Sequence, residues 1–483
     1  MKIDNTKVNL IKMRDQLIRN VKFRTINCNP KNAYYIVINP TNYCSAGCPN
    51  CLYSSINGPK SSFSSLDSTD VQKIIKIMNQ SLVKMVVFSG GGEPTENLNA
   101  ILEILKSVKS LREVVLITSA NFAETIKSTA EILNKITRGA WEYRYNQNLK
   151  PIKLTIRVSY DNDHQWKIPI GNVVNLTNYV INQNNPLLRV LIRTVLDEDE
   201  NKDESLAKLL ELELSPHKHK NNLLKGLPII DGLPCRWLID RKNKIEIPII
   251  YKPTYFVGRG KNIKKNSWSY RNIISSEIKS GSKFNLCLRG SKGEGHNYYE
   301  TLFKGHNFWK KIGKQFYNAP KNDRNKSLAL YLIADTRLFV NSGVPDIFIC
   351  AKDLTTWNQF LKFIYLDPIQ RLLIQKGPFY IKKIAREIVG DLEDKIDKAN
   401  FVFSISYLSL ETPALRLYIT IRLIQRLLKK KEIIIKHKEL VKLIHKLKIY
   451  FHNFTYKEEC CSVAKDPIIG NEESLYYLHH LQR

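Results

Sequence analysis

Three closely spaced cysteines are the clearest chemical signal in the chain. Cys44, Cys48 and Cys51 form a CxxxCxxC pattern directly after the apolar run 34–38, which predicts a buried strand. Gly47 favours a loop between them. Thiolates at such spacings bind either a tetrahedral zinc ion or an iron–sulfur cluster. An iron–sulfur cubane normally takes one cysteine per iron, so a loop with three cysteines leaves one iron without a ligand from this loop.

A second motif follows the next predicted strand. It begins directly after Ser89, which follows the apolar run 85–88, and its residues are Gly90, Gly91, Gly92, Glu93 and Pro94. Glycines at the end of a strand let the backbone approach a ligand closely. A carboxylate beside them suits an ammonium partner, because charge-assisted hydrogen bonds are the stronger ones. The two motifs together therefore suggest a metal cluster next to a ligand that carries an amino group.

This pair of motifs resembles the radical S-adenosylmethionine (SAM) superfamily. The resemblance implies that Cys44, Cys48 and Cys51 bind a [4Fe–4S] cluster, and that the GGGEP motif receives the amino group of SAM. It also implies that SAM occupies the fourth iron, and that reduction cleaves SAM to a 5′-deoxyadenosyl radical. The cysteine pattern alone leaves a zinc or redox-inert site open; GGGEP on the following strand favours the radical SAM interpretation.

The sequence departs from the family pattern at one position. Members usually have an aromatic residue just before the last cysteine, where this chain has Asn50. Tyr53, two residues after Cys51, is the aromatic candidate for a cofactor contact. The departure leaves the three cluster ligands intact.

Alternating patterns over residues 34–225 predict the fold that carries both motifs. Helical periodicity separates the apolar runs, and the strands are expected at 34–38, 85–88, 114–117, 154–158 and 188–195, with helices at 68–79, 98–108 and 123–136. Strands separated by helices pair in parallel through right-handed crossovers and place their chemistry at the carboxyl ends of the strands. The resemblance implies a partial (β/α)6 barrel here, an α/β fold, and residues 1–33 form a lead-in helix before it.

Two later strand ends add candidate cofactor contacts. By the same resemblance, Ser119 lies in a polar loop near SAM, Ser159 faces the ribose or the substrate, and Arg157 pairs with the SAM carboxylate. Asp161 is a further candidate for the ribose hydroxyls. The alternative is that Ser159 merely ends a strand and Asp161 begins a turn. His164, in the same loop, is expected to be a solvated turn residue.

Residues 226–360 predict a smaller α+β accessory domain. Short apolar runs at 245–251 and 328–333 stand there without long helices. In several radical SAM subfamilies such an extension carries auxiliary clusters, and the candidate ligands here are Cys235, Cys287 and Cys350 together with Cys28 or one of Cys460 and Cys461. Three unrelated core cysteines are the simpler interpretation. The glycine-rich loop 289–296 suggests either a phosphate-binding loop or a surface loop.

Residues 361–483 predict a basic helical region. The segment 415–453 is nearly continuously amphipathic, with apolar residues every three or four positions and basic residues between them. It fits either a basic helix for nucleic acid or an acidic membrane surface, or a pair of helices that pack on the barrel or on each other. The width of its apolar stripe favours packing.

The net charge is +30, of which +22 falls in residues 201–483. Such a field favours anionic partners, including nucleic acid and acidic peptides, although the abundance of Lys, Asn and Ile also fits a coding sequence rich in A and T. Nine cysteines without even pairing favour a reducing compartment over a disulfide framework. We see neither a secretory signal nor a transmembrane run, so we expect a cytoplasmic protein.

These observations predict a radical SAM enzyme that abstracts hydrogen from a substrate C–H bond. Its reaction class, whether oxidoreductase, lyase or transferase, stays open. The resemblance implies a reductase, or a ferredoxin- or flavodoxin-like protein, as electron donor. The accessory domain favours a peptide or protein substrate, whereas the basic charge favours a nucleotide, a nucleic acid or an anionic small molecule. A non-catalytic binding module on the same barrel is the third alternative.

Overall fold

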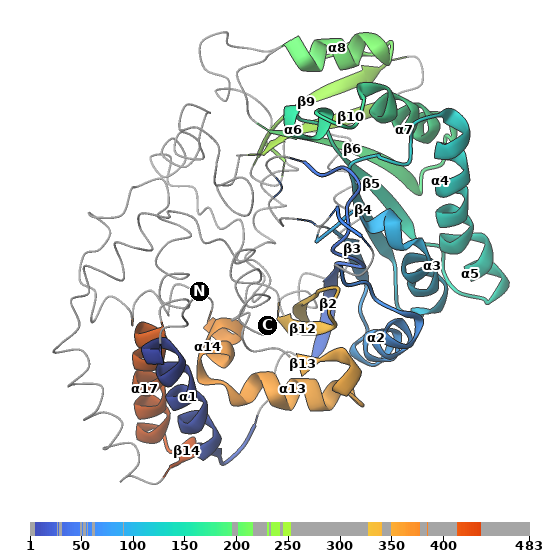
Figure 1. Ribbon diagram of the computed structural model, residues 1–483. Helices are drawn as coiled ribbons and strands as arrows, with labels where there is room; N and C mark the ends of the chain where they lie inside the picture. The colour runs from blue at the N-terminus through green and yellow to red at the C-terminus, as the bar shows by residue number, and fades with distance from the viewer. Residues whose placement is uncertain are drawn as a thin grey trace.

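The computed structural model (Figure 1) describes part of the chain. The described residues are 5–26, 28, 31–48, 51, 55, 57–59, 63–89, 91–195, 201–215, 229–230, 233–241, 245–252, 327–340, 349–376, 384 and 413–435. Tyr53, Gly90, the loop 289–296 and Cys287, Cys460 and Cys461 therefore lie outside the described residues.

The five strands predicted for the barrel form the centre of one sheet. They are parallel neighbours in chain order, and their bounds are β2 Asn32–Ile38, β3 Met85–Phe88, β4 Glu113–Thr118, β5 Lys153–Ser159 and β6 Leu188–Val195. The apolar residues of each strand explain this placement, because parallel sheets are covered on their faces and select Val, Ile and Leu. The carboxyl ends of these strands thus meet at one edge, as expected.

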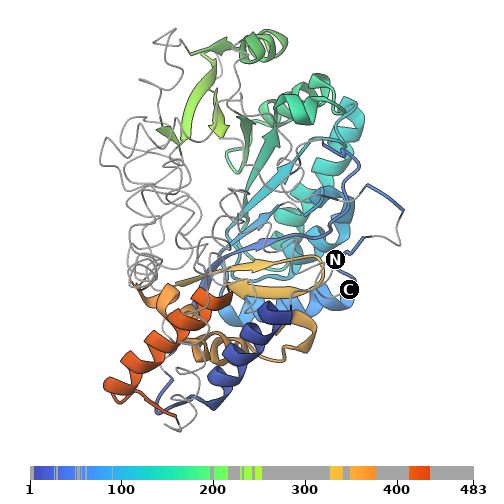
Figure 2. The same ribbon diagram turned by 60° about the vertical axis from the view of Figure 1, so that its left-hand side comes forward.

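The sheet extends beyond residue 225, where the sequence predicted a domain boundary. β10 (Ile245–Lys252) pairs in parallel with β6, and β11 (Ser327–Leu332) pairs in parallel with β2. Antiparallel strands then follow at both ends of the strand order, namely β7 Glu213–Leu214, β8 Ile229–Ile230, β9 Leu233–Asp240, β12 Arg337–Val340 and β13 Ile349–Cys350. No pairing between described strands closes the sheet, so it is an open, partial barrel (Figure 2).

Helices cover the outer face of the sheet (Figure 1). The helices at 68–79, 98–108 and 123–136 are confirmed within a few residues, and the bounds of the helices on this face are α2 Ser68–Ser81, α3 Leu98–Ser107, α4 Ile126–Ala140 and α7 Ile170–Asn182. Their apolar residues form one continuous core with alternate residues of the strands. The short helices α5 (Glu142–Asn146) and α6 (Asn162–Gln165) and the helix α8 (Asn201–Leu209) complete this part of the chain.

A buried arginine joins α5 to the end of α3 and to the segment before β5. Arg144, on α5, is fully buried and donates hydrogen bonds to the carbonyls of Leu105, Val108 and Lys150 at 2.9 Å each. The carbonyls near the end of α3 lack partners within the helix, so the guanidinium satisfies groups that would otherwise be buried unpaired. Burial lowers the pKa of Arg144 to about 10, which still leaves it charged at neutral pH.

The two ends of the described chain pack together. α1 (Asn5–Asn20) lies beside α17 (Pro413–Lys429), with Leu17 and Ile421 in a shared apolar cluster (Figures 1 and 2). β1 (Lys22–Phe23) pairs with β14 (Ile433–Ile434) below them. The predicted N-terminal helix therefore exists, but its apolar face is buried against the C-terminal region.

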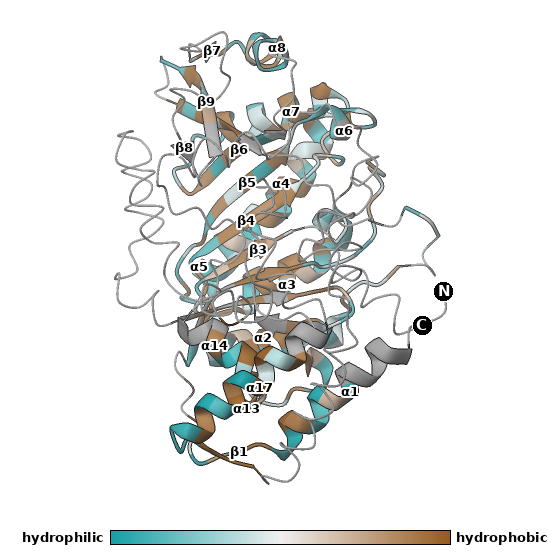
Figure 3. Cartoon of the chain, turned by 90° about the vertical axis from the view of Figure 1, so that its left-hand side faces the viewer, coloured by the Kyte–Doolittle hydropathy of each residue, from teal (hydrophilic) through white to brown (hydrophobic). Residues whose placement is uncertain are grey.

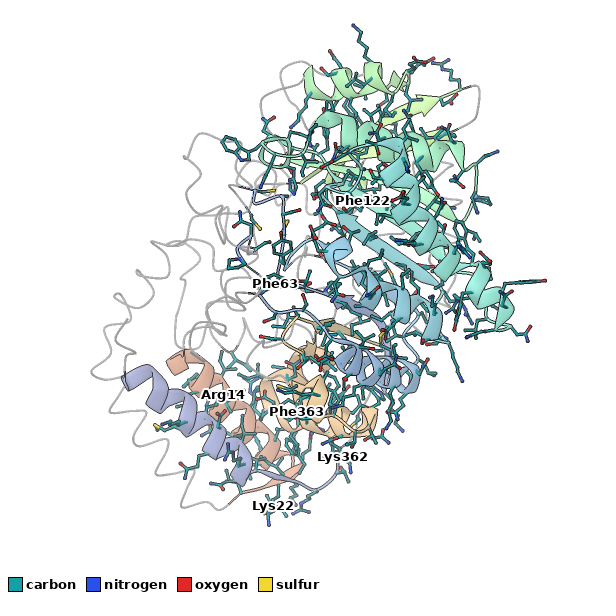
Figure 4. All side chains as sticks on the ribbon, turned by 45° about the vertical axis from the view of Figure 1, so that its right-hand side comes forward. Arg14, Lys22, Phe63, Phe122, Lys362 and Phe363 are labelled. Atoms are coloured by element: carbon teal, nitrogen blue, oxygen red, sulfur yellow. The ribbon has the colours of Figure 1, made fainter. Side chains whose placement is uncertain are left out.

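Arg14 anchors this contact. Its guanidinium forms a buried ion pair with Asp367 and donates to the hydroxyl of Thr420 at 3.1 Å (Figure 4). Asp367 precedes α14 (Pro368–Lys376), which follows α13 (Trp357–Leu366). A charge pair buried to this degree depends on both partners, because removing one leaves an uncompensated charge in the interior.

The amphipathic pattern over 415–453 is interrupted within the described residues. α17 ends at Lys429, Lys431 has the left-handed φ of 57°, and β14 follows. The periodicity of the sequence did not show this turn, because Lys431 is not a residue type that favours it. Residues 436–453 lie outside the described residues. None of the described helices is long and apolar enough to cross a membrane.

Candidate metal and cofactor site

The loop that carries the three cysteines is closed at its base by hydrogen bonds. The amide of Asn42 donates to the carbonyl of Ser64 at 3.0 Å, and the amide of Leu66 donates to the carbonyl of Pro40 at 2.9 Å. The side chain of Asn97 donates to the carbonyls of Pro40 and Leu66 as well. These bonds hold together the two ends of a long loop that begins at the carboxyl end of β2.

The cysteines lie together inside this loop. Cys44, Cys48 and Cys51 pack in one small apolar cluster with Ala46 and Ile168, and only 7% of Cys48 is exposed. The ring of Tyr43, just before the first cysteine, packs against Phe63 with centroids 4.7 Å apart and a tilt of 33° between the rings; Figure 4 labels Phe63. The loop thus gathers three soft thiol donors, one of them buried and two of them partly buried.

Backbone amides point at two of the sulfur atoms. The amides of Ala46 and Gly47 donate to Cys44, and the amide of Ser55 lies 3.4 Å from the Sγ of Cys51. The hydroxyl of Ser55 lies 3.1 Å from the same sulfur. Such hydrogen bonds stabilise thiolate sulfur and are among the features that set the potential of iron–sulfur clusters.

The pKa of Cys44 shows the cost of burying a free thiolate here. Burial and the neighbouring Glu93 carboxylate raise the pKa of Cys44 to about 12. The thiol is therefore protonated at neutral pH unless a cation replaces the proton. Binding of a metal deprotonates such a thiol outright and releases the proton.

The GGGEP motif lies against the backbone of the cysteine loop. The amide of Glu93 donates to the carbonyl of Tyr43 at 2.8 Å. A Cβ added at Gly92 would lie 1.9 Å from that same carbonyl oxygen, and one at Gly91, whose φ is +113°, would lie 2.9 Å from Asn39. Glycine is required at both positions, because a side chain would push the two loops apart. The two motifs found in the sequence are therefore one structural unit.

The carboxylate of Glu93 is engaged by the next strand end. Its Oε2 accepts from the amide and the hydroxyl of Ser119, both at 2.8 Å, and its Oε1 accepts from the hydroxyl of Thr95 at 2.9 Å. Glu93 is buried, which raises its pKa. The side chains of Glu93 and Ser119, two predicted cofactor contacts, thus bind each other, and Pro94 is buried at the start of the short helix Pro94–Asn97.

A polar network that the sequence did not predict surrounds the first cysteine. Ser45 donates to Glu96 at 2.8 Å, and Asn121 donates to both of them at 2.9 Å. Lys167, in the segment after β5, donates to the carbonyl of Ser45 at 2.9 Å. Four successive strand ends therefore meet at the residue after Cys44. Asn121 follows a predicted strand closely. Its position at the end of that strand was the one feature of the sequence that could have indicated this network.

Residues 37–164 match the family described as a 4Fe-4S single cluster domain. This range contains all three cysteines, the GGGEP motif and the strands β3, β4 and β5. The match therefore supports an iron–sulfur cluster domain in this part of the chain.

Two other comparisons add little. No curated protein matches this chain by sequence. Among solved structures, the chain is similar to one titled "Crystal structure of HydG: A maturase of the [FeFe]-hydrogenase", at 12% identity over 89% of this chain and 88% of that one, with a TM-score of 0.30. A likeness at this level carries no argument about function.

The donor set fits an iron–sulfur cluster, the group that the matched domain description names. Three thiols from one loop, two of them with amide donors at the sulfur, are typical ligands for iron. Among the residues that the structure describes, no three His, Cys, Asp or Glu side chains converge on a single metal ion. A cubane does not need that geometry, because each of its thiolates binds a different iron.

The predicted residues on β5 lie on the inner face of the sheet. Arg157 and Ser159 are half-buried there, on the face opposite the helices. Asp161 is buried, begins α6 and accepts from the amide and the Nδ1 of His164, the latter at 2.7 Å. His164 is therefore more than a solvated turn residue, since a buried carboxylate holds its ring in place. Its side chain is 23% exposed.

The described candidate ligands of an auxiliary cluster are far apart. Cys235 is fully buried on β9 among Leu191, Trp237 and Ile250. Cys350 lies on β13, at the opposite end of the strand order (Figure 1). Cys28 packs against the main core. These positions agree with the simpler interpretation, that the described cysteines outside the loop are core residues.

Proposed function

We propose that this protein is a radical SAM enzyme in which Cys44, Cys48 and Cys51 hold a [4Fe–4S] cluster. The observation that supports it most strongly is the contact between the motifs, where Gly92 and Glu93 lie directly against the backbone before Cys44. With the cluster and SAM bound, the site would supply a 5′-deoxyadenosyl radical that abstracts hydrogen from a substrate C–H bond.

The remaining site residues position that chemistry. In this proposal the backbone of the GGGEP motif, with Gly90, Gly91 and Gly92, receives the amino group of SAM. Glu93 is fully occupied by Ser119 and Thr95, so its role is to hold the loops after β3 and β4 in register. Ser159, Arg157 and Tyr53 remain candidates for contact with the rest of SAM.

The fold also limits access of water to the site. Cys48 is buried, and Ile168 covers the cysteine cluster from the segment after β5. Exclusion of water protects a reactive radical from side reactions. Electrons would come from a reductase or from a ferredoxin- or flavodoxin-like protein.

The test is anaerobic reconstitution with iron and sulfide, followed by dithionite and SAM. We expect 5′-deoxyadenosine to form with the wild-type protein and not with Cys48→Ala. Equal formation by both proteins would overturn the assignment of the ligands. No formation by the wild type, with zinc in place of iron, would overturn the function and leave a non-catalytic module.

A peptide or protein is the substrate class that we favour. A nucleotide or nucleic acid is the second candidate, because +22 of the net charge falls in residues 201–483. The salt dependence of substrate binding distinguishes the two classes, since nucleic-acid binding weakens steeply between low and moderate salt.

A further inference from the structure

The inner face of the sheet carries its charged side chains in two layers. The first layer lies toward the amino ends of the strands, with Glu113 on β4, Lys153 on β5, Arg189 on β6 and Glu246 on β10. Glu113 and Lys153 are register partners, and the negative charge of Glu113 also acts on Arg189. Two carboxylates and two cations balance each other in this layer.

The second layer lies toward the carboxyl ends and contains Arg157 and Arg193. In the strand register Arg157 is opposite Ile117, and Arg193 lies between Ser159 and Ile250. None of the described inner-face residues at this level of β4, β5, β6 and β10 is a carboxylate. Arg193 therefore has no carboxylate beside it on the neighbouring strands that the structure describes. It lies toward the edge of the sheet where the cysteine loop is found; Figure 3 looks onto this face, where teal interrupts the brown of β5.

Arg193 keeps part of its hydrogen-bonding capacity unused. Its Nε is buried without a hydrogen-bond partner among the described residues, while the side chain as a whole is only half-buried. Leu191, Trp237 and Ile250 form an apolar cluster beside it. A guanidinium in such surroundings binds an anion more strongly than one in water, and its planar fork matches a carboxylate.

Gln165 supplies an independent observation in the same region. Both its Nε2 and its Oε1 are buried, and neither has a partner among the described residues. It ends α6, which follows β5 directly and leads into Lys167 and Ile168, the residues that contact the cysteine loop. Buried amide groups are almost always paired in native proteins, so an unpaired one calls for a ligand that both donates and accepts.

We propose that Arg193 and Gln165 bind a peptide substrate that carries a side-chain carboxylate. Arg193 donates to the carboxylate, and Gln165 donates to and accepts from a peptide group. A phosphodiester would suit Arg193 equally well, but it offers no donor to the Oε1 of Gln165. This inference rests on the proposed function, because it names the substrate of that same site.

The test is binding to the full-length reconstituted protein, without reductant. The probes are two pools of fluorescein-labelled nonapeptides, randomised except at the central position, which is glutamate in one pool and glutamine in the other. We expect the wild type to bind the glutamate pool more tightly by about tenfold, and Arg193→Met to remove that preference. Arg193→Lys keeps the positive charge but lacks the planar guanidinium. It should therefore retain part of the preference for the glutamate pool.

Arg138→Met is the matched control. Arg138 is exposed on α4, where it pairs with Glu142, so the variant loses the same charge at the surface. It should keep the preference for glutamate. Gln165→Leu should weaken binding of both pools alike.

The inference is overturned if the wild type binds both pools equally, or if Arg193→Met and Arg138→Met behave alike. It is also overturned if Arg193→Met weakens binding of a labelled oligothymidine and leaves the peptides unaffected, which would indicate a nucleic-acid substrate. The assay involves no turnover. A protein that shows the glutamate preference but forms no 5′-deoxyadenosine would contradict the proposed function and leave the peptide site standing.

Discussion

The two halves of the sheet edge differ in how their polar groups are used. In the loops after β2, β3 and β4, the described buried side-chain polar atoms all have partners, and Glu93 accepts from Ser119 and Thr95. On β6 and in the segment after β5, Arg193 and Gln165 keep buried atoms that have no hydrogen-bond partner among the described residues. The first half is built to hold its own loops in place around a resident cluster, whereas the second keeps capacity for a molecule that arrives and leaves.

The largest effect is expected from removing a cluster ligand. Cys48→Ala should abolish iron incorporation, because no other cysteine in the described part of the loop replaces it. Iron content per chain and the visible absorbance after reconstitution measure this. Cys350→Ala, a half-buried cysteine on the edge strand β13, is the control and should keep its full iron content. Equal loss in both variants would contradict the special role of the loop.

Gly92→Ala should have the second-largest effect. Its Cβ would clash with the carbonyl of Tyr43 at 1.9 Å, so the cysteine loop and the GGGEP loop must separate. We expect a loss of about 3 kcal/mol in the free energy of unfolding and poor cluster assembly. Gly171→Ala is the matched control, since Gly171 lies in α7 with nothing within 4 Å of its added Cβ. It should be neutral or slightly stabilising.

Ser119→Ala tests whether the buried polar groups in the loops after β2, β3 and β4 are paired with one another rather than with a cofactor. The hydroxyl donates to the buried Glu93 carboxylate, so its loss should lower the free energy of unfolding by about 2 kcal/mol. SAM affinity should change little. A variant with unchanged stability but much weaker SAM binding would mean that Ser119 contacts the cofactor itself.

Ser55→Ala should have the smallest effect. The variant loses the hydroxyl near Cys51 and keeps the backbone amide. We expect a slightly lower reduction potential of the cluster, because a donor to the sulfur favours the more negative, reduced form. Redox titration measures this, and Ser128→Ala at the exposed start of α4 is the control. A rise in the potential would contradict the role of Ser55.

Local sequence patterns were sufficient for the central strands. The apolar runs 85–88 and 188–195 are β3 and β6 with identical bounds, and both motifs lie at the carboxyl ends of strands. The order of the strands in the sheet could not be predicted in the same way. The sequence predicts strands near β10 and β11, but periodicity does not say which partner a strand will pair with, so their places beside β6 and β2 could not be predicted.

The sequence was also insufficient for contacts between distant segments. Arg14 reaches Thr420, and α1 is buried against α17 rather than leading directly into the sheet. The sequence predicts that the backbone at Gly92 closely approaches a ligand. In the structure the group that it approaches is the backbone of Tyr43. Such contacts depend on tertiary packing, which overrides local preferences.

The central claim is that the cluster of Cys44, Cys48 and Cys51 leaves one iron open for SAM. Electron paramagnetic resonance of the dithionite-reduced protein, with and without SAM, tests it most directly. We predict a [4Fe–4S]⁺ signal that changes shape when SAM is added, because a new ligand joins the open iron. A signal that is the same with and without SAM, or no cluster signal at all, would contradict the claim.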